Sequence, residues 1–379
     1  MNSTIFDNIN RNSLKNKTKQ ESLYQFYNRT SRVDVERVRN LLDQCLGNFP
    51  VNEQQEILSR LRSNDDVDFN STCFELLLHE TLIRKGYILK VHPDVPNSNK
   101  KPDFFVISPN KEEFYLEAKV FFDESAQVRK HRKINNAVID YINKHPHKNF
   151  WIRLEGEPKY NKQAAPKVIK KMIHNWLDTL DPDNEPTFGD DSYSERKIKI
   201  ITLDDWSVKI SAVPQSASMR GNAEELIGSS FSDVTFLETT DAIKAAVELK
   251  AKRYGELDKP YVLALNCLSS FGMDHLDERD ALFGYPDPIT LRRYGKAVFY
   301  NNGAARNEGL SSVWMFRGLV PNSINTCIQN LYINPFAKLS SPIEMLCFPS
   351  VTIDEKEINC YKGESLKDVF GFPELWPSD

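Results

Sequence analysis

The sequence lacks the patterns that mark several common classes of protein. Its six cysteines include no Cys-x-x-Cys pair, and its seven histidines include no His-Glu-x-x-His motif. Scattered thiols of this kind are typical of a reduced, cytoplasmic protein, and zinc is not expected. No apolar run reaches the ~18 residues that a membrane-spanning helix needs. Residues 1–20 also lack the apolar core of a signal peptide, so we expect neither a membrane segment nor a leader.

The chain also has little net charge. The formal charge is −4 over 379 residues, with 40% hydrophobic and 27% charged residues, which is ordinary for a globular protein. Any basic surface that binds a polyanion must therefore be local. The length is sufficient for a large core and favours more than one domain.

Hydrophobic periodicity predicts a definite order of elements in the first part of the chain. Residues 1–30 are polar and are predicted to form a loosely held arm. Gly47 and Gly86 indicate the ends of two of the helices that follow. The order from residue 68 onward is α-β-β-β-α-β. We expect helices at 32–47, 51–62, 68–85 and 124–143, and strands at 87–91, 103–108, 114–122 and 149–155.

The second half reads as a further mixture of helices and strands without an internal repeat. Residues 214–235 read as mostly loop, and Trp206 and Trp314 read as core residues or substrate contacts. Expected helices are 167–180, 240–253 and 275–283. Expected strands are 197–203 and 207–213 as a hairpin, 260–266, 313–316, 327–333, and a last hairpin over 351–361.

The predicted strand 114–122 carries an unusual pair of charges. Side chains alternate between the faces of a strand. Glu117 and Lys119 therefore share one face, roughly 7 Å apart at ~3.4 Å per residue. The opposite face is wholly apolar and must face the core: Phe114, Leu116, Ala118, Val120 and Phe122. A carboxylate and an ammonium group on one face suit a site that binds a metal ion and a phosphate group.

Asp103 opens the preceding strand. Pro102 before it fixes φ and suits the start of a strand. If these two strands are antiparallel neighbours, Asp103 lies beside Glu117, and the two carboxylates match what Mg²⁺ usually takes from a protein.

The motif Pro102-Asp103 with Glu117-Ala118-Lys119 resembles the signature of the PD-(D/E)xK nuclease superfamily, which has the restriction-endonuclease-like fold. The family core has the order αβββαβ, and many members add an acid from the first helix, where Glu75 stands here. The resemblance covers roughly residues 68–156.

The resemblance implies a metal-dependent endonuclease that hydrolyses phosphodiester bonds. Asp103 and Glu117 would bind Mg²⁺ or Mn²⁺, Glu75 would support the metal site, and Lys119 would position the attacking water. DNA is the expected substrate, in the cytoplasm, and restriction or phage defence is the role suggested by analogy. Because many relatives act as dimers, a homodimer is an open alternative.

Each of these residues also has a plain structural interpretation. Glu117 and Lys119 could form a solvated pair on an open sheet. Asp103 could be a turn residue, and Glu75 could be a surface acid. Pro93-Asp94 competes with Pro102-Asp103 but is followed by no apolar strand. His79, one helical turn after Glu75, is expected to pack against a helix, and His92 is a weaker candidate for the site.

A basic segment follows the Glu117 strand. Residues 124–148 hold six Lys or Arg and two acids, a local excess of four positive charges. The first turns of the predicted helix carry the candidate nucleic-acid contacts Arg129, Lys130, Arg132 and Lys133. A solvated helix face is the alternative. Weaker candidates are Lys167, Lys170 and Lys171, and the pair Arg292 and Arg293.

The sequence thus predicts a mixed α/β (α+β) protein in three parts. These are an N-terminal arm with helices (1–67), a nuclease-like core (68–158) and an α/β accessory region (159–379). The rival to an enzyme is a nucleic-acid-binding or assembly module on the same fold with weak or no hydrolysis. A third alternative is a phosphodiesterase of small nucleotides, which would lack the steep salt dependence of polynucleotide binding.

Overall fold

The computed structural model describes residues 4–96, 98–122, 126–156, 164–186, 196–231, 239–268, 273–287, 293–302, 304–354 and 357–378. The fold is mixed α/β, and the chain divides into two compact units. The core unit comprises residues 1–15, 22–123 and 237–379. The inserted unit comprises residues 16–21 and 124–236. Each unit has its own hydrophobic core.

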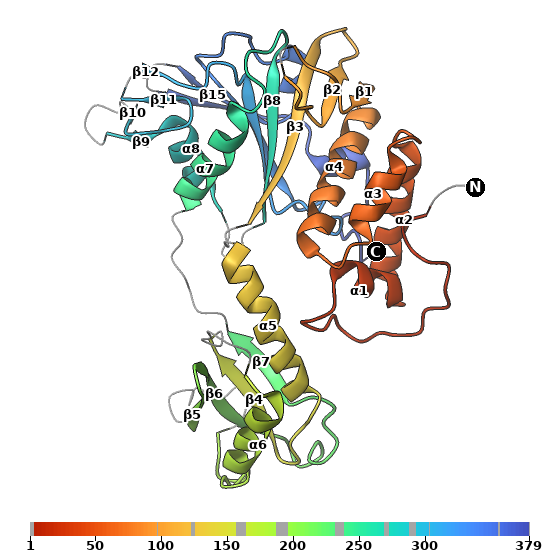
Figure 1. The fold of residues 1–379 in the computed structure, drawn as a ribbon, viewed down its shortest axis with the longest axis vertical. Coiled ribbons are helices and arrows are strands. Elements are labelled where there is room, and N and C mark those ends of the chain that lie inside the picture. The colour runs from red at the N-terminus through yellow and green to blue at the C-terminus, as the bar shows by residue number, and fades with distance from the viewer. Residues whose placement is uncertain are drawn as a thin grey trace. The chain divides into compact units, whose positions relative to one another are not determined.

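The core unit is built on an eight-stranded mixed sheet, as far as the described residues show (Figure 1). Strand β3 is antiparallel to β2 and parallel to β8. In spatial order the strands are β1 (Ile88–Val91), β2 (Phe104–Ile107), β3 (Glu113–Phe122), β8 (Tyr261–Leu268), β13 (Ser312–Arg317), β14 (Ile328–Ile333), β15 (Ser350–Asp354) and β16 (Glu357–Tyr361). A parallel pair needs a crossover connection. Between β3 and β8 the chain makes the inserted unit and then helix α7 (Thr239–Ala251).

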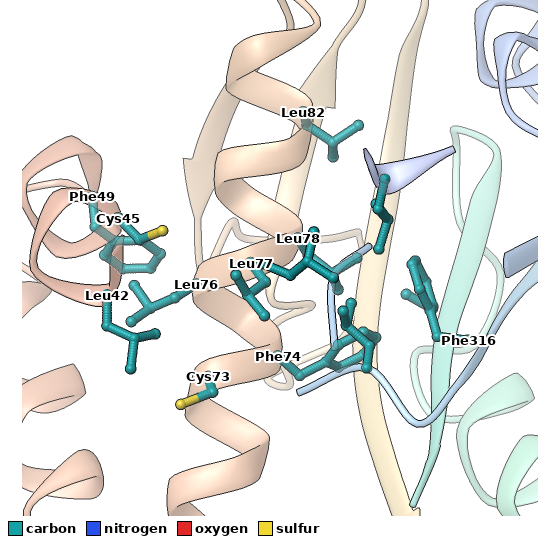
Figure 2. Packing of buried hydrophobic residues seen from close by; sticks show 14 of the residues in the cluster. Leu42, Cys45, Phe49, Cys73, Phe74, Leu76, Leu77, Leu78, Leu82 and Phe316 are labelled. Carbon is teal, nitrogen blue, oxygen red and sulfur yellow. The ribbon is translucent and has the colours of Figure 1, made fainter. Parts of the chain in front are cut away.

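One face of this sheet is covered by the N-terminal helices α1 (Leu23–Arg29), α2 (Val33–Asn48), α3 (Gln54–Leu61) and α4 (Asp66–Arg84). Helix α4 is apolar on two sides because it lies between the sheet and the outer helices (Figure 2). Its Leu76 packs with Leu42 of α2, and its Phe74 meets Phe316 of β13 edge-on, with 5.2 Å between ring centroids. This central position places Glu75, the residue after Phe74, beside the sheet.

The ends of α4 follow from its sequence. The Asp65 carboxylate caps the helix by accepting the Val67 N–H at 2.8 Å, so the helix begins two residues before the expected start at residue 68. Asp66 and Asp68 add negative charge in the first turn, where the helix dipole favours it. Gly86 takes φ = +81° just after the helix, a conformation that glycine adopts without strain.

The other face of the sheet is covered by α7 and α8 (His275–Phe283) (Figure 1). Along β8, Val262 and Ala264 belong to the cluster under the N-terminal helices, whereas Leu263 and Leu265 pack with α7 and α8. The alternation of a strand explains this division. Both faces of β8 are therefore buried, and so is the face of β3 that carries Glu117.

The remaining elements of the core unit lie around this framework. Short hairpins pair β9 (Tyr285–Pro286) with β10 (Arg293–Tyr294), and β11 (Tyr300–Asn301) with β12 (Ala304–Ala305). A 3-10 helix, η2 (Ile343–Cys347), and helix α9 (Leu366–Phe370) complete the described chain. In the ranges given above, no helix has the length and apolar character needed to cross a membrane.

The inserted unit packs two helices on a smaller sheet. The helices are α5 (Ala126–Asn143) and α6 (Pro166–Leu177), and the strands are β4 (Phe150–Glu155), β5 (Ile198–Leu203), β6 (Trp206–Pro214) and β7 (Ile227–Phe231). The strand order is β5-β6-β4-β7. Val138 and Ile142 of α5 and Ile173 of α6 share one cluster with Ile152 and Trp206 of the sheet.

The sequence located most elements but misassigned one connection. Helix α5 and strand β4 form where expected, but β4 pairs with β6 and β7 in the inserted unit and not with β3. Strand β8 takes the predicted place of β4 beside β3. The prediction that 124–143 and 149–155 complete the core sheet is therefore wrong. Chain order does not reveal pairing when a whole compact unit is inserted.

Two other expectations also require correction. Residues 1–30 were expected to be a loosely held arm, but the described part, 4–30, contains α1, and Ile5 and Phe6 are buried in the main core. The described part of residues 214–235 is mostly loop, as expected, although it also contains β7. The predicted parts 1–67, 68–158 and 159–379 also differ from the compact units, because residues 124–158 lie in the inserted unit and 237–379 in the core unit.

Candidate active site

Asp103 and Glu117 meet where β2 begins beside β3. The antiparallel register pairs Phe104 with Leu116, and the Asp103 Oδ2 accepts the backbone N–H of Ala118 at 2.6 Å. Asp103 also continues the pairing with the end of β1, since its carbonyl accepts the His92 N–H at 3.0 Å. The prediction that Asp103 lies beside Glu117 is confirmed, and Asp103 is held through its carbonyl on one side and its carboxylate on the other.

Glu117 is buried, with 2% of its surface exposed. Its Oε1 accepts a hydrogen bond from the Lys250 ammonium, and its Oε2 accepts one from the Tyr254 hydroxyl. The Tyr254 hydroxyl oxygen also lies 3.2 Å from the Lys101 carbonyl oxygen, close to the Pro102-Asp103 step. The interpretation of Glu117 as a solvated acid on an open sheet is excluded.

Glu75 approaches this pair from α4. Its carboxylate forms a bidentate ion pair with Arg60 of α3, with N–O distances of 2.5 and 2.7 Å. Burial alone would lower the pKa of the Arg60 guanidinium, but the pairing with Glu75 outweighs burial and raises it. Glu75 is thus no simple surface acid, and Arg60 fixes where its charge lies.

The three carboxylates influence one another electrostatically. The pKa of Asp103 lies well above its ordinary value because burial, the charge of Glu117 and the charge of Glu75 all disfavour its ionised form. The Ala118 N–H and the Lys250 ammonium act in the opposite direction without cancelling the rise. Burial and the neighbouring acids thus favour the neutral form of Asp103, and a cation bound beside it would favour the ionised form.

Lys119 lies two residues beyond Glu117 on the same face of β3. It is half-buried, opposite Leu265 of β8 in the parallel register. Tyr115 and Phe121, on the same face, pack into the cluster under α7 and α8. The alternation predicted for this strand is confirmed.

The donor chemistry fits a hard divalent cation. Asp103 and Glu117 together supply the one or two carboxylates through which Mg²⁺ is usually held. Among the described residues, Glu75, Asp103 and Glu117 do not bring three ligand oxygens within 4.8 Å of one another. The three carboxylates are thus not already gathered as a three-ligand group, and a metal would be held by the Asp103–Glu117 pair.

A second group of ligand atoms does meet that distance. One ligand atom each from Glu53, Glu56 and His92 lies within 4.8 Å of the others, and His92 Nδ1 is 3.4 Å from Glu53 Oε2. Glu56 is exposed, and Glu53 and His92 are half-buried. The His92 ring thus lies beside Glu53 and Glu56 of the α3 region, although the His92 backbone pairs with Asp103.

The other candidates near the site have structural roles. His79 is 2% exposed, lies 4.8 Å from the Phe49 ring, and has a pKa lowered to about 4 by burial. It packs between helices, as expected. The Asp94 side chain is 91% exposed and pairs with Lys101 at 2.9 Å, which supports the choice of Asp103 over Asp94.

The predicted nucleic-acid contacts are not located. The side chains of Arg129, Lys130, Arg132 and Lys133 lie outside the described part of the structure, although the backbone of α5 is described. Arg292 is likewise outside it. The proposal for this basic segment stays a prediction from the sequence.

Three residues of the site were missed from the sequence: Arg60, Lys250 and Tyr254. For Lys250 a signal exists. It follows Ile243 and Val247 at spacings of four and three, so it stands in the buried stripe of α7, where a lysine needs a partner. Arg60 and Tyr254 carry no comparable signal.

Comparison with protein-family models, curated proteins and solved structures finds no match to this chain. The functional argument therefore depends on the residues and geometry described above.

Proposed function

We propose that the core unit is a metal-dependent nuclease of the PD-(D/E)xK class that hydrolyses phosphodiester bonds in nucleic acid, with DNA as the expected substrate. The single observation that carries this proposal is the contact of Asp103 with the Glu117-Ala118-Lys119 strand, where the Asp103 carboxylate accepts the Ala118 N–H beside buried Glu117. A chance occurrence of the two short motifs gives no reason for them to meet in space.

The chain order of the core unit supports the same proposal. Helix α4, the antiparallel strands β1, β2 and β3, helix α7 and the parallel strand β8 follow one another as αβββαβ. That is the order expected for the family, with the inserted unit between β3 and α7 in place of a short connection. Asp103, Glu117 and Lys119 lie on the strands that the family motif would use.

Each residue then has a defined task. Asp103 and Glu117 would hold Mg²⁺ or Mn²⁺, which would polarise the phosphate and lower the pKa of the attacking water. Lys119 would orient that water and offset phosphate charge. Arg60 fixes the Glu75 carboxylate, whose charge acts on Asp103. A role in restriction or phage defence belongs to this proposal by analogy alone.

The test is a cleavage assay on supercoiled plasmid, linear duplex, single-stranded DNA and RNA, each with Mg²⁺, Mn²⁺ or EDTA. We expect cleavage that requires the metal and falls by roughly 10²-fold or more in Lys119→Ala and Glu117→Gln. Glu113→Gln is the matched control, because Glu113 lies on the same strand but pairs with Lys259 away from the acids. Full activity in Lys119→Ala would contradict the mechanism.

A second candidate function is a nucleic-acid-binding or assembly module with weak or no hydrolysis. The observation that favours it is the internal pairing of the acids, since Lys250 already bonds Glu117 and Arg60 already bonds Glu75. Such a module would bind nucleic acid with a steep salt dependence, cut none of the four substrates, and show no Mn²⁺ binding in a titration.

A further inference from the structure

The carboxylate of Glu117 is contacted by side chains that come more than a hundred residues later in the chain. Lys250 lies near the end of α7, 133 residues after Glu117, and its ammonium bonds Glu117 Oε1. Tyr254, in the turn after the helix, bonds Oε2. Both oxygens of the acid assigned to metal binding are therefore engaged by groups of the protein itself.

Lys250 is held in this position by its surroundings. The Tyr261 hydroxyl of β8 donates to the Lys250 carbonyl at 3.3 Å, and the Tyr254 ring meets the Tyr261 ring edge-on at 5.7 Å. Ile243 and Val247 anchor the preceding turns of α7 in the core. Only 9% of the Lys250 surface is exposed, so most of the side chain is out of solvent and its charge needs a partner.

Arg60 and Lys250 bond different carboxylates of the acid cluster. Arg60 bonds Glu75, which is outside the Asp103–Glu117 pair. Lys250 bonds Glu117 directly. Asp103 accepts a neutral backbone N–H instead. A divalent ion that takes Glu117 would thus face the Lys250 ammonium across the same carboxylate, and like charges at that distance repel.

We propose that Lys250 is the internal counter-ion of the metal-free site and competes with the divalent ion for Glu117, so that metal binding displaces the Lys250 ammonium. This rests on the proposed function, because it takes Asp103 and Glu117 as the metal ligands. Lys250 is then a positioning residue, which holds the Glu117 carboxylate in place until the metal arrives. Tyr254 is the neutral second donor and does not compete by charge.

The test is Mn²⁺ binding to the purified full-length chain, measured by titration calorimetry without nucleic acid. Lys250→Met removes the charge and keeps an unbranched side chain only one atom shorter, so we expect Mn²⁺ to bind roughly tenfold more tightly than to the wild type. Lys250→Arg keeps the charge and should bind no more tightly than the wild type. Lys252→Met, at an exposed lysine two residues on, is the matched control and should leave affinity unchanged.

The outcomes separate this proposal from the proposed function. Wild-type binding with no gain in Lys250→Met overturns the competition and leaves the nuclease proposal standing. If neither protein binds Mn²⁺, both the competition and the proposed metal-dependent nuclease are overturned. If only the Lys250→Met protein binds Mn²⁺, the result supports a competition strong enough to prevent binding by the wild type.

A further measurement does not depend on a variant that folds. Reductive methylation of wild-type lysines, read by peptide mass spectrometry, should show Lys250 protected in EDTA and modified severalfold faster with saturating Mn²⁺. Lys252 serves as the internal reference, because it is exposed in the structure. Equal modification of Lys250 in the two conditions would overturn the displacement.

Discussion

A buried histidine on α4 couples the stability of the core unit to pH. His79 lies against Phe49 and Phe104, and within the described part of the chain its Nδ1 has no hydrogen-bond partner. Burial lowers its pKa from 6.5 to about 4, and the neighbouring charge of Glu80 only partly opposes this. The folded chain therefore keeps His79 neutral where the unfolded chain protonates it.

The sign of the pH effect follows directly. Between pH 6.5 and about 4 the unfolded state binds the extra proton, so stability falls as the pH falls through this window. We expect the contribution of His79 to lower the free energy of unfolding of the wild type by about 2 kcal/mol at pH 5 relative to pH 7. Urea unfolding of wild type and His79→Leu at both pH values measures this, and an equal pH dependence in the two proteins would contradict it.

At the scale of residues, the sequence located the members of the acid cluster that lie on β3 and at the start of β2. Strand alternation and the start of β2 gave Asp103, Glu117 and Lys119, because these depend on local chain geometry. The partners Arg60 and Lys250 could not be derived in the same way. Each belongs to another helix, and Lys250 arrives 133 residues later, so the contact with Glu117 is a result of tertiary packing.

At the scale of elements, α4 connects the outer helices to the sheet. Phe74 is fully buried against Phe316, whereas Ile83 on the same helix is 37% exposed. Phe74→Ala removes a large ring from a packed core, so we expect the free energy of unfolding to fall by about 3–5 kcal/mol. Ile83→Ala, the control, should cost under about 1 kcal/mol.

Chemical denaturation of the two variants measures this difference. Similar losses for Phe74→Ala and Ile83→Ala would mean that α4 does not pack on the sheet as described. The Phe74 change leaves Glu75 in place, so a loss of stability is expected without direct removal of a site residue.

The elements themselves could largely be predicted, and their pairing could not. Apolar periodicity located β1, β2, β3, α7 and β8 close to their observed bounds. It also located α5 and β4, and nothing in their local pattern distinguished them from the elements that complete the core sheet. A strand buried on both faces, such as β8, has the same continuous apolar sequence whichever neighbour it joins.

At the scale of the whole molecule, two units with separate cores should unfold in separable transitions. Ile173 lies in the core of the inserted unit with no exposed surface. We expect Ile173→Ala to destabilise one transition by about 2–5 kcal/mol and to leave the other in place. Differential scanning calorimetry measures both, and Phe74→Ala should show the reverse pattern. A common shift of both transitions would contradict this division.

The insertion between β3 and α7 also has a consequence for synthesis on the ribosome. When Asp103 and Glu117 have emerged, the helix and strand that cover them are still to be translated, since Lys250 follows 133 residues later. The inserted unit is complete before then and can fold first, because domains generally fold as units during synthesis. A nascent chain thus carries its acidic residues uncovered for the time that about 130 codons require. Any activity of this site arises only late in translation, when β8 joins β3.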